Sequence, residues 1–74
     1  MITNALLEAM EARPVDGWAA MPRTKVDGAI VALLEAARGH LDEEHADRMR
    51  RLASTLILIQ RDTDAALQAE AAAS

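Results

Sequence analysis

The chain has 74 residues, a net charge of −4 and no cysteine. A chain of this length forms at most one domain, near the lower size limit for a self-sufficient core. Without cysteine, neither disulfides nor a cysteine-based zinc site can stabilise it. The acidic balance argues against nucleic acid as a partner, because phosphate binding requires a basic surface.

The composition predicts helices. Trp18 is the only aromatic residue, and alanine is abundant beside leucine, isoleucine and methionine. Alanine-rich, aromatic-poor chains suit closely packed helices rather than sheets. We therefore predict an all-α fold with a single helical domain over residues 1–74. It is a small three-helix protein with two short helices and one long C-terminal helix.

The first predicted helix covers residues 3–12. Thr3 or Asn4 can accept a hydrogen bond from the free amides of the first turn. Pro14 ends the segment, because proline disfavours helical geometry at the residue before it. The packing face is expected to consist of Ile2, Leu6, Ala9 and Met10.

Residues 13–24 are predicted to form a structured connector without a helix of its own. Two prolines and the Asp16-Gly17 pair are typical turn signals. Within this connector, Trp18 is expected to cover one end of the core. The alternative is an exposed anchor for a partner, since tryptophan is enriched among binding hot spots.

The second predicted helix covers residues 25–38. Thr24 and Asp27 have the spacing of a capping box, with Thr24 as the N-cap. Gly39 is expected to end the helix in the left-handed conformation. The predicted core positions are Val26, Ile30, Leu33, Leu34 and Ala37.

The third predicted helix covers residues 43–70, with Asp42 as its N-cap. Residues 54–60 have a strand-like composition, but the helical periodicity continues on both sides without a turn signal, so we favour a helix. Apolar and small residues recur at alternating steps of three and four, which places them in one stripe. This stripe consists of Met49, Leu52, Leu56, Ile59, Thr63 and Ala66.

Four consecutive aliphatic residues, 56–59, lie within that helix. At about 100° per residue they extend most of the way round it, so the helix must be covered on more than one side. Either the first two helices or a second copy of the chain can provide this cover. We predict a homo-oligomer, as a dimeric bundle. The residues expected to pack or to bind a partner are Met49, Leu52, Leu56, Ile57, Leu58, Ile59 and Trp18.

The sequence predicts no catalytic, metal-binding or cofactor-binding residues. His40 and His45 are five residues apart, whereas a helical zinc motif requires a spacing of four. An arginine cluster at residues 48–51 could bind phosphate or an acidic peptide. We favour its pairing with acidic residues four positions earlier. Ser54 lies within a helix rather than at a nucleophile elbow, and we expect no enzymatic activity.

The expected function is therefore that of a small, non-enzymatic regulatory protein that acts by protein–protein interaction. It would inhibit or restrain a larger protein, such as a transcriptional regulator, whose identity the sequence leaves open. In size and class the chain is similar to small helical antiactivators and phage-encoded inhibitors. The alternative is a structural or assembly subunit whose long helix packs into a larger complex. No apolar run approaches the roughly 20 residues that span a bilayer, and no signal peptide is recognisable. We therefore expect a cytoplasmic protein without a membrane partner.

Overall fold

The computed structural model describes residues 2–40 and 42–73. Within these ranges the chain forms helices and no strand, which confirms the all-α prediction, but there are four helices rather than three. Their bounds are α1 (Asn4–Ala12), α2 (Val15–Ala19), α3 (Arg23–Arg38) and α4 (Glu43–Ala73).

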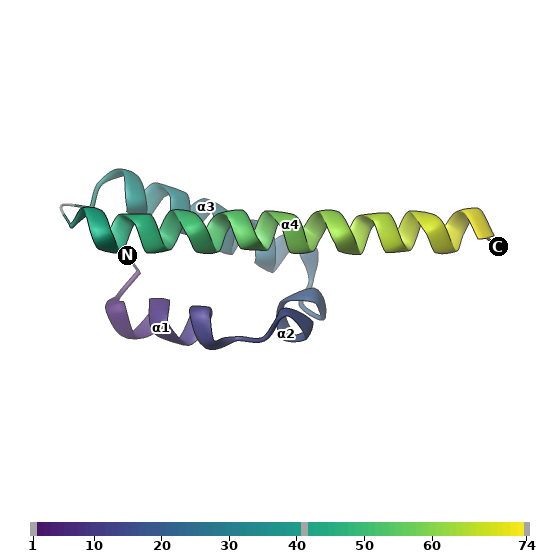
Figure 1. Cartoon of the computed structure of the whole chain (residues 1–74), viewed down its shortest axis with the longest axis horizontal. Coiled ribbons are helices and arrows are strands. Elements are labelled where there is room, and N and C mark those ends of the chain that lie inside the picture. The colour runs from purple at the N-terminus through teal and green to yellow at the C-terminus, as the bar shows by residue number, and fades with distance from the viewer. Residues whose placement is uncertain (1, 41, 74) are drawn as a thin grey trace.

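The helices form a short bundle with one projecting end. Helices α3 and α4 are antiparallel neighbours, and α1 and α2 follow one another along a second side of α4 (Figure 1). Helix α4 has 31 residues against 16 in α3. At about 1.5 Å per residue, it is therefore about twice as long as α3. Its C-terminal part continues beyond α2 and α3 without a neighbouring helix (Figure 1).

Helix α4 begins where the sequence predicts. The Asp42 carboxylate accepts hydrogen bonds from the backbone N–H groups of Glu44 (3.0 Å) and His45 (3.3 Å). These contacts satisfy two of the free amides of the first turn. The helix ends at Ala73, three residues later than the predicted Glu70. The extra residues are alanines, which have the highest helix propensity.

The predicted connector is partly helical. Helix α2 has Pro14 as its N-cap, and the Trp18 N–H donates to the Pro14 carbonyl at 3.2 Å. Proline is well suited to a helix start, because it has no N–H to leave unsatisfied. The turn predicted at Asp16-Gly17 was therefore wrong, because both residues lie within α2.

The predicted capping box was also wrong. Helix α3 begins at Arg23 with Pro22 as its N-cap, so Thr24 already lies within the helix. The Asp27 carboxylate is instead occupied by the side-chain amide of Gln60, at 2.5 Å. A contact with α4 thus replaces the local contact. Helix α3 ends at Arg38, as predicted, but Gly39 has φ −99° rather than the expected left-handed conformation.

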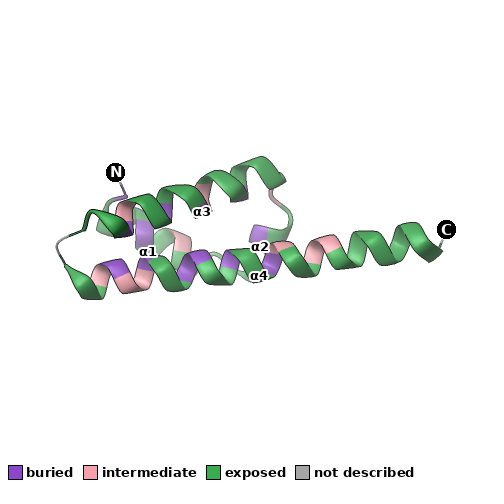
Figure 2. Ribbon diagram, turned by 90° about the horizontal axis from the view of Figure 1, so that it is seen from above, coloured by how far each residue is buried: buried purple, intermediate pink, exposed green. Residues whose placement is uncertain are grey.

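The core lies where α1, α2 and α3 meet α4 (Figure 2). Three predicted packing positions are exposed, namely Leu6 (47%), Ala9 and Leu34 (43%), whereas Leu7, which was not predicted to pack, is fully buried. The core side chains are those of Ile2, Leu7, Trp18, Val26, Ile30, Leu33, Ala37, Ala46, Met49, Leu52, Ala53, Leu56 and Ile59.

Candidate functional site: an exposed surface between α3 and α4

The predicted stripe of α4 packs inside the chain. Met49, Leu52, Leu56 and Ile59 are buried, Thr63 is half-buried and Ala66 is exposed. A seam with a second copy therefore cannot use the first four residues, because the chain's own helices already cover them.

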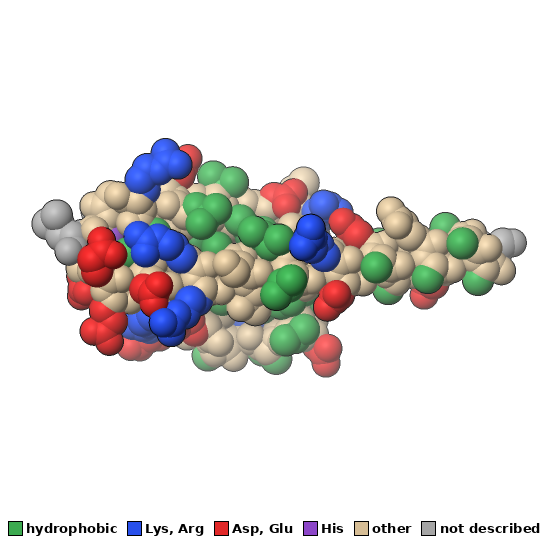
Figure 3. All heavy atoms as spheres, turned by 45° about the horizontal axis from the view of Figure 1, so that its top comes forward, with side chains coloured by type: hydrophobic (Ala, Val, Ile, Leu, Met, Phe, Trp, Pro, Cys, Tyr) green, Lys and Arg blue, Asp and Glu red, His purple; other side chains and the backbone are tan. Residues whose placement is uncertain are grey.

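The other two aliphatic residues of the four-residue run have a different environment. Ile57 is 40% and Leu58 is 57% exposed. On α3, Val31 and Leu34 are also exposed. We refer to these four side chains, together with Arg38, Arg50 and Arg61 around them, as the α3–α4 face. The space-filling view shows hydrophobic side chains gathered over these two helices, with both basic and acidic side chains at either end of the cluster (Figure 3).

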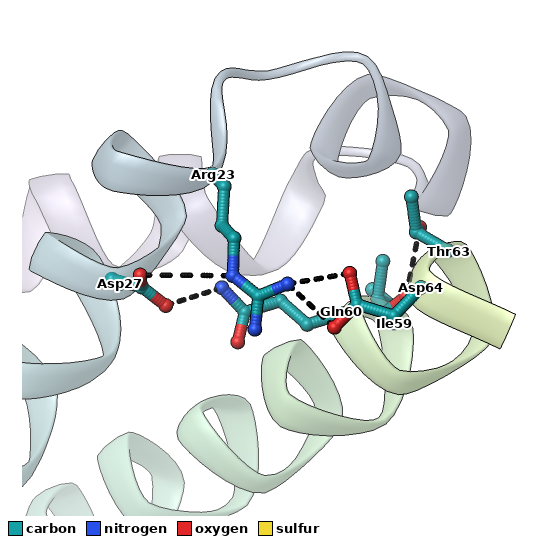
Figure 4. A network of polar contacts seen from close by, with 6 residues as sticks. All are labelled: Arg23, Asp27, Ile59, Gln60, Thr63 and Asp64. Atoms are coloured by element: carbon teal, nitrogen blue, oxygen red, sulfur yellow. Dashed lines mark hydrogen bonds and ion pairs between the residues drawn. The ribbon is translucent and has the colours of Figure 1, made fainter. Parts of the chain in front are cut away.

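The register between the two helices places Val31 of α3 level with Ile57 of α4. Arg23 on α3 contacts Asp64 on α4 at 2.5 Å, and Asp27 contacts Gln60 at 2.5 Å (Figure 4). Each step of four residues along α3 corresponds to four residues back along α4, as expected for antiparallel helices. One further turn brings Val31 level with residues 56–57.

Helical spacing connects the arginines to this cluster. On α4, Arg61 lies three residues after Leu58 and four after Ile57, which are the spacings of surface neighbours on a helix. On α3, Arg38 lies four residues after Leu34, which is also a spacing of surface neighbours. Arg38 and Arg61 are exposed. Among the described residues, neither of these two makes an ion pair. Arg50 has one distant acidic neighbour, Glu43, at 4.0 Å.

A polar network closes one end of the α3–α4 face. The Arg23 guanidinium contacts both carboxylate oxygens of Asp64, and it lies 4.0 Å from Asp27 (Figure 4). The Asp64 carboxylate raises the pKa of Arg23 above its ordinary value, chiefly by accepting the hydrogen bonds. The network therefore neutralises the acidic groups at this end.

A cleft of about 450 Å³ lies on another side of α4. Trp18, Val26 and Ile59 form its apolar walls, and Leu67 lies at its outer end on the projecting part of α4. Trp18 itself is only 4% exposed and lies with the core residues. The guanidinium carbon of Arg13 lies 4.9 Å from the centre of the Trp18 ring, which is within cation–π distance.

The predicted arginine cluster is divided among different partners. Arg51 pairs with Asp47 at 2.7 Å, four residues earlier. Arg48 pairs with Glu11 of α1, rather than with Glu44. The hydrogen bond from Arg48 lowers the pKa of Glu11 below its ordinary value of 4.5. This contact fastens α1 to α4.

Other candidate chemistry is sparse in the part of the chain that the structure describes. The rings of His40 and His45 stack at 4.5 Å, and the His40 side chain accepts a hydrogen bond from the Asp42 N–H. The described part of the chain contains no group of three histidine, cysteine, aspartate or glutamate side chains that could hold a metal ion. No described helix has an apolar stretch suited to crossing a membrane. Among the surfaces described, the α3–α4 face presents the most large aliphatic side chains to solvent.

Sequence reasoning missed half of this surface. Ile57 and Leu58 were candidates, but Leu34 was assigned to the core and Val31 was not considered. A usable signal existed, because Val31 and Leu34 are three residues apart and Val31 lies off the core stripe of α3. Comparison with known proteins found no relatives: no family model, no curated protein and no solved structure matches the chain.

Proposed function

We propose that this chain is a small, non-enzymatic regulatory protein that binds a larger protein through the α3–α4 face. The observation that carries the proposal is the exposure of four large aliphatic side chains, Val31, Leu34, Ile57 and Leu58, on the two adjacent helices α3 and α4. Clusters of exposed large aliphatic residues with a polar rim are typical of protein interaction sites. The partner would be a protein that is restrained when bound, such as a transcriptional regulator.

Two features favour regulation by binding over catalysis. Several charged side chains are paired with one another across the helices, as Arg23 is with Asp64 and Arg48 is with Glu11, and such pairs act in packing rather than in catalysis. The aliphatic residues of the α3–α4 face lie on the two longest helices, which pack against each other. A rigid surface of this kind lowers the entropic cost of binding.

The test is a pull-down from the native host with tagged protein and mass spectrometry, comparing the wild type with two variants. Leu58 and Leu67 are equally exposed, at 57% and 58%. They are nine residues apart on α4 and therefore lie on opposite sides of the helix. We expect Leu58→Glu to lose the partner and Leu67→Glu to retain it. A partner that Leu58→Glu still captures at the wild-type level would contradict the proposal.

The second candidate is a structural or assembly subunit. The length of α4 and its projecting C-terminal part favour it, because such an end can pack into a larger complex (Figure 1). Circular dichroism of the purified chain separates the two candidates. A regulator is expected to be folded and to unfold cooperatively without its partner. A subunit is expected to be largely unfolded until it assembles.

A further inference from the structure

We propose that a pocket between α1 and α3 binds a small aliphatic carboxylate of the fatty-acid type. The pocket has a volume of about 390 Å³, which lies in the range of about 300–1,000 Å³ that is typical of small-molecule sites. We call it the α1–α3 pocket. Its walls include Leu6 and Met10 of α1, Ala29 and Ala32 of α3, and the cationic residues Arg13 and Lys25. It shares no residue with the α3–α4 face, so this inference goes beyond the proposed function.

The polar side chains of the α1–α3 pocket select an anion. Among its described lining residues, only Arg13, Trp18 and Lys25 have a nitrogen or oxygen atom in the side chain. All three side chains donate hydrogen bonds, and none of them can accept one. An ionised carboxylate only accepts hydrogen bonds, and its bonds to cationic donors are stronger than those between neutral groups. A carboxylate therefore matches these donors, whereas the rest of the lining requires an apolar body.

The two cations of the pocket are available to a ligand. The guanidinium group of Arg13 lies over the Trp18 ring and contacts the sulfur atom of Met21. Apolar side chains thus position this cation. Arg13 and Lys25 are exposed, and neither forms an ion pair within the described ranges. A bound carboxylate would be their first acidic partner among those residues.

Three carboxylates of α1 and α3 are directed toward α4. Glu11, chiefly by accepting a hydrogen bond, and Glu8, by its charge, raise the pKa of Arg48 on α4. Both therefore lie on the α4 side of α1. Asp27 of α3 accepts a hydrogen bond from Gln60 of α4. None of these three carboxylates lines the pocket.

The remaining carboxylates of α1, α2 and α3 are those of Asp16 and Glu35. Asp16 precedes Trp18 by two residues on α2, which is about 200° round the helix, so the two residues lie on opposite sides of α2. Glu35 follows Lys25 by ten residues on α3, which is about 15 Å along the helix axis. Neither carboxylate lines the pocket. The end of the pocket that contains Arg13 and Lys25 is therefore locally basic.

The pocket has one charged end and one apolar end. Helix α2 joins the C-terminal end of α1 to the N-terminal end of α3 (Figure 1). Arg13 and Lys25 therefore both lie near α2, and the apolar lining continues from there along the two helices toward Leu6 and Ala32. From Lys25 to Ala32 the lining extends about 10 Å along α3. This arrangement fits a ligand with a charged head and a single alkyl chain, such as decanoate.

The probe is decanoate, titrated below its micellar concentration at neutral pH and measured by isothermal titration calorimetry. Its matched controls are decanol, which has the same chain without a charge, and decyltrimethylammonium, which carries the opposite charge. We expect decanoate to bind on the order of tenfold more tightly than decanol, because two exposed charge contacts contribute about that factor. Decyltrimethylammonium should bind more weakly than decanol. Hexanoate should bind at least about tenfold more weakly than decanoate, because it buries fewer methylene groups.

Two further measurements on the wild type place the ligand in this pocket. Trp18 is the only tryptophan and lines the pocket, so its emission should change on titration with decanoate and saturate with the same Kd. A ligand that contacts both α1 and α3 should also raise Tm, because it binds the folded chain only. Decanol at equal concentration should raise Tm less.

A pair of double variants tests the role of the two cations. Arg13→Gln/Lys25→Gln is expected to bind decanoate only as tightly as decanol. Arg38→Gln/Arg61→Gln changes the net charge by the same amount outside the pocket, and it should keep the wild-type preference. Circular dichroism spectra of both variants should match that of the wild type.

A single variant tests the apolar end of the pocket. Ala32 is exposed, so Ala32→Glu should leave the fold intact while its carboxylate abolishes decanoate binding. Leu58→Glu, on the α3–α4 face, should bind decanoate like the wild type. If Arg13→Gln/Lys25→Gln does not fold, Ala32→Glu and the comparison of ligands on the wild type decide the question.

Several outcomes would overturn the inference. Equal affinity for decanoate and decanol would show that the cations do not select the ligand, and no binding of decanoate up to millimolar concentration would exclude the site. A preference for decanoate that persists in Arg13→Gln/Lys25→Gln, or is lost equally in Arg38→Gln/Arg61→Gln, would assign the effect to another surface or to net charge. Undiminished binding to Ala32→Glu would likewise place the alkyl chain elsewhere.

Discussion

Leu56 shows how a single position determines the packing of this chain. It is fully buried on the longest helix, at the level where α3 packs against α4. Its neighbours Ile57 and Leu58 are exposed, although the three residues are similar in hydrophobicity. Their difference comes from the helical angle, because each residue is rotated by about 100° from the one before.

Leu56→Ala is expected to lower the free energy of unfolding by about 2–5 kcal/mol, because it leaves a cavity in the core. Small domains have only about 5–15 kcal/mol in total. Leu58→Ala is the matched control, since Leu58 is 57% exposed, and it should change stability by less than about 0.5 kcal/mol. Urea denaturation measures both values. Equal effects of the two substitutions would show that the register of α4 is different.

At the scale of elements, the helix start of α4 was predictable because its cap is local. Asp42 bonds to amides two and three residues away. The start of α3 was not predictable in this way. Asp27 has the correct spacing for a capping box, but Gln60 of α4 occupies it. Arg48 similarly pairs with Glu11 of α1 rather than with the acid four residues earlier. In both cases the side chain contacts a residue far away in the sequence instead of the predicted neighbour on its own helix. A local sequence pattern predicts only contacts between residues that are close in the sequence.

Gly28 is expected to weaken α3. It lies within the helix, and a Cβ added there meets no atom within 4 Å. Glycine in a helix costs about 0.5–1 kcal/mol relative to alanine, because the unfolded chain gains conformational freedom. Gly28→Ala should therefore raise the free energy of unfolding by about that amount. Gly17→Ala is the control, since its Cβ would lie 3.1 Å from a carbon of Arg13. A gain from Gly17→Ala as large as that from Gly28→Ala would contradict this reasoning.

The contact between α1 and α4 is expected to make stability depend on pH. The hydrogen bond from Arg48 lowers the pKa of Glu11 in the folded state below 4.5. A group with a lowered folded pKa stabilises the protein above its unfolded pKa, and this contribution is lost as pH falls through the folded value. The contribution should therefore be present above about pH 4.5 and decline below it.

Glu11→Gln removes the titrating group and tests this expectation. Thermal unfolding followed between about pH 6 and pH 3 should give a shallower loss of stability for the variant than for the wild type. The two proteins should also differ less at pH 3 than at pH 6. Parallel pH profiles would mean that Glu11 does not contribute. Glu35 is exposed and forms no ion pair within the described residues, so Glu35→Gln is the control.

At the scale of the whole molecule, the all-α class was predictable from composition and periodicity, whereas the interaction surface was only half predictable. Ile57 and Leu58 stood out because four aliphatics in a row cannot all face one side of a helix. Val31 and Leu34 did not, since their exposure depends on the rotation of α3 relative to α4. The pairing of Arg23 with Asp64 contributes to that rotation, across a separation of 41 residues.

The projecting part of α4 is a candidate contact for a second copy of the chain. The homo-oligomer remains a proposal. Along this side of α4, Ile59 is buried, Thr63 is half-buried and Leu67 is 58% exposed, and the end of the helix extends beyond α2 and α3 (Figure 1). The cleft beside Trp18 lies directly next to this stretch. Two copies related by a two-fold axis could each place a projecting end along the other's cleft, so that both unpartnered surfaces are covered at once.

We therefore expect the molar mass from light scattering to approach twice the 8.0 kDa of the chain at high micromolar concentration and to decrease on dilution. One helix end and one cleft per copy form a small interface, below about 1,200 Å², which is typical of weak association. Leu67→Glu should remain monomeric, because it places a charge at the centre of the contact. Leu58→Glu should dimerise like the wild type, since Leu58 is on the opposite side of α4. Tryptophan emission should shift with concentration in the wild type but not in Leu67→Glu, because Trp18 lines the cleft. A mass of one chain at every concentration would exclude this dimer and leave the end of α4 free for a different partner.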